Sequence, residues 1–240
     1  MGINIGIIEI EAENALCREM RLDIRKARVD DVRGFEDISE SDRIVTLEKA
    51  RELFPDWEQF TDRNRIGADA DAVYLEKIRD AGDIALLAPF SGLRHTGWVP
   101  LEGLSPERRE AVLSASAPEN RLTGWDLIGF DEMKDICGRC RLSWDKGRGC
   151  IGTFGPDNSL LPEIAGRHGC PFVASVPEAA AAGRIFTPED ALTLLEEVER
   201  LTEVLPSEGK MMVRRYSGPL ERLGAVGRIS SEEGCGFHFF

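Results

Sequence analysis

The stretch that decides the expected fold is residues 171–205, PFVASVPEAAAAGRIFTPEDALTLLEEVERLTEVL. Its first six residues, 171–176, are mostly apolar and predict a buried strand. Thr187 and Pro188 predict the start of a helix, because threonine can cap free N–H groups and proline has no N–H to leave unpaired there. Leucine and valine then recur every three to four residues up to residue 205, as on the buried face of a helix.

The rest of the chain extends this alternation of strands and helices. Further strands are expected at residues 3–10, 84–88, 125–130, 210–216 and 235–240. Further helices are expected at residues 46–54, 71–81, 105–114, 159–168 and 217–234. The alternation favours an α/β fold, a mostly parallel sheet flanked by helices, with a Gly/Cys-rich metal-binding segment at 137–170. We expect one domain over residues 1–240, with a possible lobe boundary near residue 120.

Composition restricts the class of protein. The chain has 240 residues, with 30 Lys and Arg against 43 Asp and Glu, and its formal net charge is −13. Such a surface repels phosphate, so nucleic acid is not an expected partner. No apolar run approaches the ~20 residues of a membrane span, and the first residues, MGINIGIIEIEAEN, have no signal-peptide pattern. Six cysteines in a chain of this length do not indicate a secreted disulfide scaffold, so we expect a reducing, cytoplasmic location.

Four of the cysteines form the strongest motif: Cys137-x2-Cys140-x9-Cys150-x19-Cys170. A C-x2-C pair lets two thiolates reach one metal centre from a tight turn, and Gly138 favours such a turn. Thiolates are ligands for zinc, copper(I) and iron–sulphur clusters. The pattern occurs in many unrelated proteins and identifies no family.

Spacing and charge favour an iron–sulphur cluster of the [4Fe–4S] type over zinc. Structural zinc sites usually have two close ligand pairs, and here only an irregular pair of His168 and Cys170 could provide the second. Pro171 follows Cys170, as proline follows the last ligand of the bacterial ferredoxin motif. Residues 133–150 contain five Lys and Arg but two Asp, a local charge of +3 that would stabilise an anionic cluster.

This interpretation predicts electron transfer or cofactor handling within a larger redox assembly. A protein partner is expected to dock near Trp144 and Arg148, since electrons leave through a molecule held close to the cluster. The first alternative is a zinc-stabilised interaction or adaptor module without catalysis. A C-x2-C redox pair of Cys137 and Cys140 also stays open.

The remaining candidates have ordinary structural interpretations. Cys17 and Cys235 are expected in the core as small apolar side chains, so changing Cys17 to Ser is expected to leave metal content unaltered. His238, in an aromatic run, is expected to pack structurally.

A second possible site lies in the loop of residues 152–159, before an expected helix. Gly152, Gly155 and Ser159 could bind an anionic cofactor group there, although a turn with a helix cap explains the same residues. His95 follows an expected strand, where ligands bind in α/β sheets. The second alternative is therefore a small-molecule enzyme with its site near His95 and this loop. No catalytic residue can be assigned, and whether the protein is an enzyme stays open.

Overall fold

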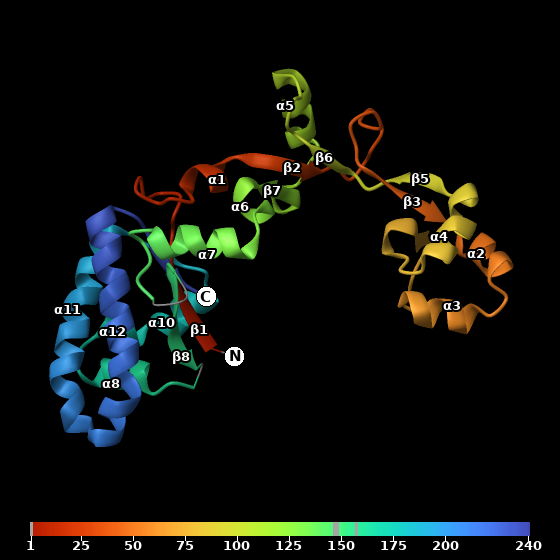
Figure 1. The fold of residues 1–240 in the computed structure, drawn as a ribbon. Helices are drawn as coiled ribbons and strands as arrows, with labels where there is room; N and C mark the ends of the chain where they lie inside the picture. The colour runs from red at the N-terminus through yellow and green to blue at the C-terminus, as the bar shows by residue number, and fades with distance from the viewer. Residues whose placement is uncertain (1, 146–148, 157) are drawn as a thin grey trace. The chain divides into compact units, whose positions relative to one another are not determined.

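The computed structural model describes residues 2–145, 149–156 and 158–240 of the chain. It divides into two compact units (Figure 1). Unit 1 contains the residues up to Asp23 together with Gly124–Phe240, and unit 2 contains Ile24–Thr123. The sequence suggested one domain with a possible boundary near 120. The chain passes from unit 1 to unit 2 after Asp23 and returns to unit 1 after Thr123. We identified no sequence signal for the first of these two crossings.

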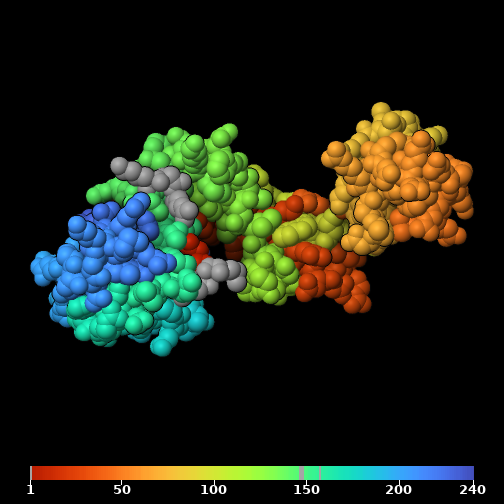
Figure 2. Space-filling model, turned by 90° about the horizontal axis from the view of Figure 1, so that it is seen from below, coloured from red at the N-terminus to blue at the C-terminus, as the bar shows by residue number. Residues whose placement is uncertain are grey.

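Unit 1 is built around a four-stranded sheet in the order β8-β1-β10-β9. Its strands are β1 (Gly2–Ile7), β8 (Ile151–Pro156), β9 (Ile185–Phe186) and β10 (Phe237–Phe239). β1 lies between β8 and β10, so the first strand of the chain is inside the sheet. In the view of Figure 2, red residues from the start of the chain show only as small patches among the later residues of unit 1.

The helices of unit 1 supply most of its core. They are α1 (Arg18–Leu22), α6 (Gly124–Leu127), α7 (Phe130–Arg139), α8 (Leu161–Arg167), α9 (Pro171–Ala174), α10 (Val176–Ala181), α11 (Pro188–Val204) and α12 (Lys210–Glu233). The Thr187 side chain accepts from the N–H of Asp190, and the Asp190 side chain accepts from the N–H of Thr187, so a capping box begins α11. α11 and α12 form a long helical hairpin (Figure 1) whose leucines pack with Phe237 and Phe239.

Unit 2 contains two small sheets and two separate hydrophobic cores. One sheet has the order β6-β2-β7, from Trp98–Pro100, Ile24–Arg28 and Arg121–Thr123, with α5 (Pro106–Ser114) beside it. The other has the order β4-β3-β5, from Val73–Tyr74, Ser41–Val45 and Gly92–His95. α2 (Leu47–Leu53), α3 (Trp57–Asn64) and α4 (Ala81–Leu87) pack with this second sheet.

The expected mostly parallel sheet is wrong. Every strand pairing in the described part of the chain is antiparallel. The connection from β9 to β10 shows the reason. A single helix between two strands would bring the chain back to start a parallel strand. Here the hairpin of α11 and α12 crosses the unit twice, so β10 runs antiparallel to β9.

Four of the expected strands are helical in the structure, so the strand–helix alternation expected from the sequence is not present. Residues 84–88 fall mainly in α4, 125–130 in α6 and α7, 171–176 in α9 and α10, and 210–216 in α12. Short apolar runs fit a strand and a buried helical turn equally well, so periodicity could not separate them. The expected helix at 71–81 instead holds β4 and a short 3-10 turn, Leu75–Lys77.

The expected metal-binding segment at 137–170 is also not a separate element of the fold. It consists of the end of α7, β8 and α8, which belong to the sheet and core of unit 1. In the described ranges, no group of three or more His, Cys, Asp or Glu residues is arranged to hold a metal ion. Nor does any helix among these residues have the length and apolar character to cross a membrane.

Candidate functional site

Four cysteines of unit 1 form what we call the thiol cluster: Cys17, Cys137, Cys140 and Cys150. Cys17 precedes α1, Cys137 lies in the last turn of α7, Cys140 follows α7, and Cys150 precedes β8. Cys17 is a buried member of the unit 1 core, and the other three are half-buried against that core. Electrostatic coupling joins Cys17 to Cys140, Cys140 to Cys137, Cys137 to Cys150, and Cys150 to Cys17. The fold therefore gathers thiols from three separate segments.

The turn after α7 fixes the position of Cys137. The N–H of Cys140 donates to the carbonyl of Cys137 at 3.2 Å, and the Ser143 hydroxyl donates to the same carbonyl. Gly149 approaches from the other side with a φ of +75°, and a Cβ there would lie 3.6 Å from the Cys137 sulphur. A glycine suits this position because other residues rarely adopt that backbone angle.

Trp144 covers the beginning of β8 beside the thiol cluster. Its indole Nε1 donates to the carbonyl of Cys150 at 3.0 Å. A Cβ on Gly152 would lie only 2.2 Å from the Trp144 ring, so the ring contacts this glycine directly. Gly152 thus permits the close approach of Trp144.

Glu9 and Arg21 complete the surroundings of the thiols. The Cys150 thiol donates to Oε1 of Glu9 at 3.0 Å, and Nη2 of Arg21 lies 3.3 Å from the same oxygen. The Arg21 guanidinium also lies 5.0 Å from the centre of the Trp125 ring. Its Nε is buried without a hydrogen-bond acceptor among the described residues. One cation therefore faces several thiols and a carboxylate, with a donor still unused.

Burial and neighbouring charge raise the pKa of three of these thiols. Burial is the largest cause that raises the pKa of Cys150, and the Glu9 carboxylate raises it further. Burial and then the charge of Cys140 raise the pKa of Cys137. Burial also raises the pKa of Cys17, although a hydrogen bond with Arg21 opposes this effect. Each thiolate would repel the next, which opposes the ionisation of more than one of them.

Cys170, the expected fourth ligand, lies in a different part of unit 1. It is fully buried before α9, and its thiol contacts the carbonyls of His168 and Glu197 at 3.7 and 3.8 Å. The charged groups that act on it are Glu197 and Arg200, with no cysteine among them. The structure therefore does not bring Cys170 to Cys137, Cys140 and Cys150, and its position before Pro171 caps a short helix.

The histidines are also separate from the thiol cluster. Nε2 of His168 lies 2.7 Å from Oε1 of Glu208, so its near partner is a carboxylate. His238 lies in β10, and its Nδ1 is buried without a partner among the described residues. His95 is exposed in β5 of unit 2, whereas residues 152–159 belong to unit 1.

The expected anion loop is largely a strand. Gly152 and Gly155 lie in β8, at the edge of the sheet, and the Ser159 hydroxyl accepts from the N–H of Leu161 at 3.3 Å. Gly152 packs under Trp144 and Ser159 stabilises the start of α8. These contacts account for Gly152 and Ser159 without a ligand.

The sequence predicts Cys17 in the core, where it lies, but it does not connect Cys17 or Glu9 with the other thiols. Both precede unit 2 in the chain, and Cys17 is separated by more than a hundred residues from the other three thiols. Local spacing cannot detect a ligand contributed from so far away. The one sequence signal for a link between Cys17 and a charged group was Arg21, which follows this polarisable thiol by four residues.

Comparisons with family models, with curated proteins and with solved structures found no match. The function must therefore be argued from the chemistry of the thiol cluster.

Proposed function

We propose that unit 1 binds an iron–sulphur cluster through Cys17, Cys137, Cys140 and Cys150, and acts in electron transfer or cofactor handling. The observation that carries the proposal is that these four thiols, from three segments of the chain, pack on one core and lie within range of one another's charge. Cys17 replaces Cys170 in the ligand set expected from the sequence. Such a cluster would supply a one-electron change to the protein that holds it.

The electrostatics favour a metal centre over a C-x2-C redox pair. Reactive thiol pairs work as thiolates, which are stabilised at the positive N-terminal end of a helix. Cys137 and Cys140 instead lie at the C-terminal end of α7, where the helix dipole disfavours negative charge. Glu9 adds a carboxylate beside Cys150. A metal ion would offset all these negative groups, and thiols lose their protons when they bind one.

Two features favour an iron–sulphur cluster over zinc. The four cysteines come from three segments with unequal spacing, whereas structural zinc sites usually use two close pairs. The buried Nε of Arg21 is also available to donate a hydrogen bond toward an anionic cluster. Hydrogen bonds of this kind set the reduction potentials of such clusters.

The proposal includes a rearrangement of side chains. The thiols do not form a closed ligand shell among the described residues. Rotation about Cα–Cβ bonds is the smallest change that could direct them to one centre, because all four already contact the same core. Free thiols are also required, and all six cysteines are free, which supports our placement of the protein in the cytoplasm.

We further propose that a protein partner receives the electron beside Trp144. Its ring is half-buried next to Cys150, so part of it is open to a partner. Arg148, the other residue expected on this surface, lies outside the described residues.

The test is anaerobic reconstitution of the full chain with iron and sulphide. We expect acid-labile sulphide, a broad visible absorption band, and bleaching of that band on addition of dithionite. Cys17→Ser is expected to abolish most iron incorporation. Cys170→Ser is the matched control, because it removes one buried thiol outside the cluster, and it is expected to bind iron as the native chain does.

Two results would contradict the proposal. If Cys170→Ser lost iron and Cys17→Ser retained it, the ligand set would be wrong. A colourless protein that binds one zinc ion and does not respond to dithionite would replace the redox function with a zinc-stabilised interaction module.

A further inference from the structure

Unit 2 contains a cavity of about 620 Å³ that is unrelated to the thiol cluster. It lies at the C-terminal end of α3, and the following residues, from Arg65 to Arg79, form most of its wall. Ligand cavities for small molecules typically have volumes of about 300–1,000 Å³, so its size fits a metabolite.

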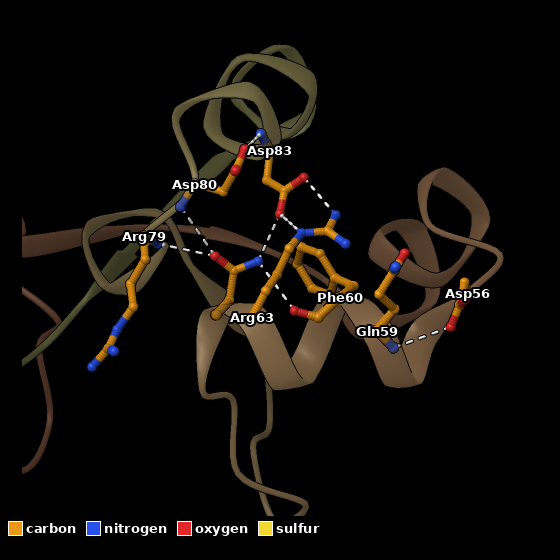
Figure 3. A network of polar contacts seen from close by, with 8 residues as sticks. Asp56, Gln59, Phe60, Arg63, Arg79, Asp80 and Asp83 are labelled. Atoms are coloured by element: carbon orange, nitrogen blue, oxygen red, sulfur yellow. Dashed lines mark hydrogen bonds and ion pairs between the residues drawn. The ribbon is translucent and has the colours of Figure 1, made fainter.

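A buried polar network holds two sides of this cavity together (Figure 3). The Asn64 side chain is 3% exposed, and its Oδ1 accepts from the backbone N–H groups of Arg79 at 3.0 Å and Asp80 at 3.2 Å. Its Nδ2 donates to the carbonyl of Phe60 and to Asp83. The end of α3 and the segment around Arg79 are therefore fixed to each other before any ligand binds.

Three basic residues line the cavity: Arg65, Lys77 and Arg79. All three are exposed, and none has an ion-pair partner in the described part of the chain. In Figure 3 the Arg79 side chain extends away from Asp83 and the network. Arg63 shows the contrast, because it makes two hydrogen bonds to Asp83 at 2.7 Å.

The acidic residues of the cavity do not balance these cations. Asp71 pairs with Arg94 at 2.6 Å and accepts from the Tyr74 hydroxyl at 3.2 Å. The bond to Arg94 lowers the pKa of Asp71, so this carboxylate is charged and already compensated. Asp69 is left to face three positive groups. An excess of cations at one cavity is notable in a chain with a net charge of −13.

We propose that this cavity binds a small organic phosphate. Arg and Lys recognise phosphate oxygens with charge-assisted hydrogen bonds, and the three basic residues provide the positive charge. Ile66 lines the same cavity and offers apolar contact to the body of the ligand, whereas Val73 and Ile78, which also line it, are almost fully buried. The Lys77 ammonium lies 4.5 Å from the centre of the Tyr74 ring, so this lysine already rests on one wall.

The test is calorimetric titration of the full chain with inorganic phosphate and with phenyl phosphate, at constant ionic strength. We expect saturable binding of one equivalent, with phenyl phosphate several-fold tighter because its ring contacts the apolar wall. Arg79→Gln and Lys77→Gln are each expected to weaken binding roughly five- to tenfold. Arg65→Asn is expected to do the same, and asparagine tolerates the φ of +54° at this position.

Arg51→Gln is the matched control. Arg51 belongs to the same part of unit 2, is exposed, lies against Trp57 and does not line the cavity. We expect it to change the affinity less than twofold. Equal losses in Arg51→Gln and Arg79→Gln would show nonspecific charge attraction and overturn the proposal. Absence of saturable binding by the folded native chain would overturn it as well, and so would calcium binding that Asp69→Asn abolishes.

Discussion

The thiol cluster of unit 1 and the Asn64–Asp83 network of unit 2 are both partly buried polar groups, but they differ in completeness. In unit 2, Arg63 and Asn64 together direct three hydrogen bonds to the Asp83 carboxylate. The Asn64 amide uses its oxygen and its nitrogen twice each. In unit 1, the thiols would repel one another if they ionised, and the buried Nε of Arg21 has no acceptor among the described residues.

This difference separates a structural network from a candidate binding site. A buried polar group costs free energy unless it is paired, so a complete network stabilises the fold that contains it. A group that lacks a partner within the chain is stabilised when a ligand supplies one. The predictions below test this contrast, beginning with the largest expected change in stability.

Breaking the complete network should have the largest effect. Asp83 is nearly buried, with a side chain 6% exposed, and Asp83→Ala leaves Arg63 and Asn64 without their acceptor. We expect a loss of about 3 to 5 kcal/mol in the free energy of unfolding of unit 2, measured by urea denaturation. Asp71→Ala is the control, because its ion pair with Arg94 is exposed and is expected to contribute little to stability. Similar losses in the two variants would contradict a special role for the Asn64 network.

Supplying the missing partner should have the next largest effect. If the thiol cluster binds iron and sulphide, ligand linkage is expected to stabilise unit 1 by about 3 kcal/mol at roughly a hundredfold excess over the dissociation constant. Unfolding of unit 1 can be followed anaerobically by tryptophan fluorescence, before and after reconstitution. Cys150→Ser is expected to remove this gain. A gain that persists in Cys150→Ser would show that the added metal binds elsewhere.

Crowding the covered side of the cluster should have a smaller effect. Gly152→Ala would place a Cβ 2.2 Å from the Trp144 ring, which must move and lose its bond to Cys150. We expect a loss of about 1 to 3 kcal/mol and a shift in tryptophan fluorescence. Gly138→Ala is the matched control, since a Cβ there meets nothing within 4 Å. It lies inside α7, so alanine should raise stability by about 0.5 to 1 kcal/mol. Loss of stability in both variants would contradict the conclusion that a Cβ has space at Gly138 but not at Gly152.

Acid should weaken unit 2 gradually. Hydrogen bonds from Arg63 lower the pKa of Asp83 below its ordinary value. In the unfolded chain the Asp83 carboxyl has the higher pKa, so it binds a proton first as pH falls. The stabilisation by Asp83 is therefore complete above about pH 5 and is lost below about pH 4. The slope from this group is at most about 1.4 kcal/mol per pH unit. Urea midpoints measured between pH 6 and 3 test this, and Asp83→Asn should show a flatter profile than the native chain.

Helices with chemical start signals could be predicted from the sequence, and most strands could not. Thr46, Ser105 and Thr187 each accept a hydrogen bond from a backbone N–H at the start of α2, α5 and α11, where helices were expected. These caps are local, so the sequence records them directly. The run 171–176 was interpreted as a strand because it is short and apolar, but tertiary packing makes it helical.

For the candidate site too, the sequence predicted only what depends on residues close together in the chain. Cys137 and Cys140 lie at the end of α7 and Cys150 directly before β8, and all three pack against the core of unit 1. The positions of Cys17 and Cys170 depend on long-range packing, which local spacing does not record. Cys170 is buried beside Glu197, whose carboxylate accepts from the N–H groups of Phe172 and Val173.

The insertion of unit 2 into unit 1 has a consequence for the order of events during synthesis. Asp23 and Gly124 are joined by a backbone hydrogen bond of 2.9 Å, so the chain leaves unit 1 and re-enters it at one place. The ribosome completes unit 2 first, while β1 and Cys17 wait for β8, β10 and the other three thiols. At roughly 5 to 20 residues per second, the first segment of unit 1 stays without the other three thiols for about 7 to 27 seconds. Cells therefore have a period in which the exposed, apolar β1 is available to chaperones and Cys17 to oxidants.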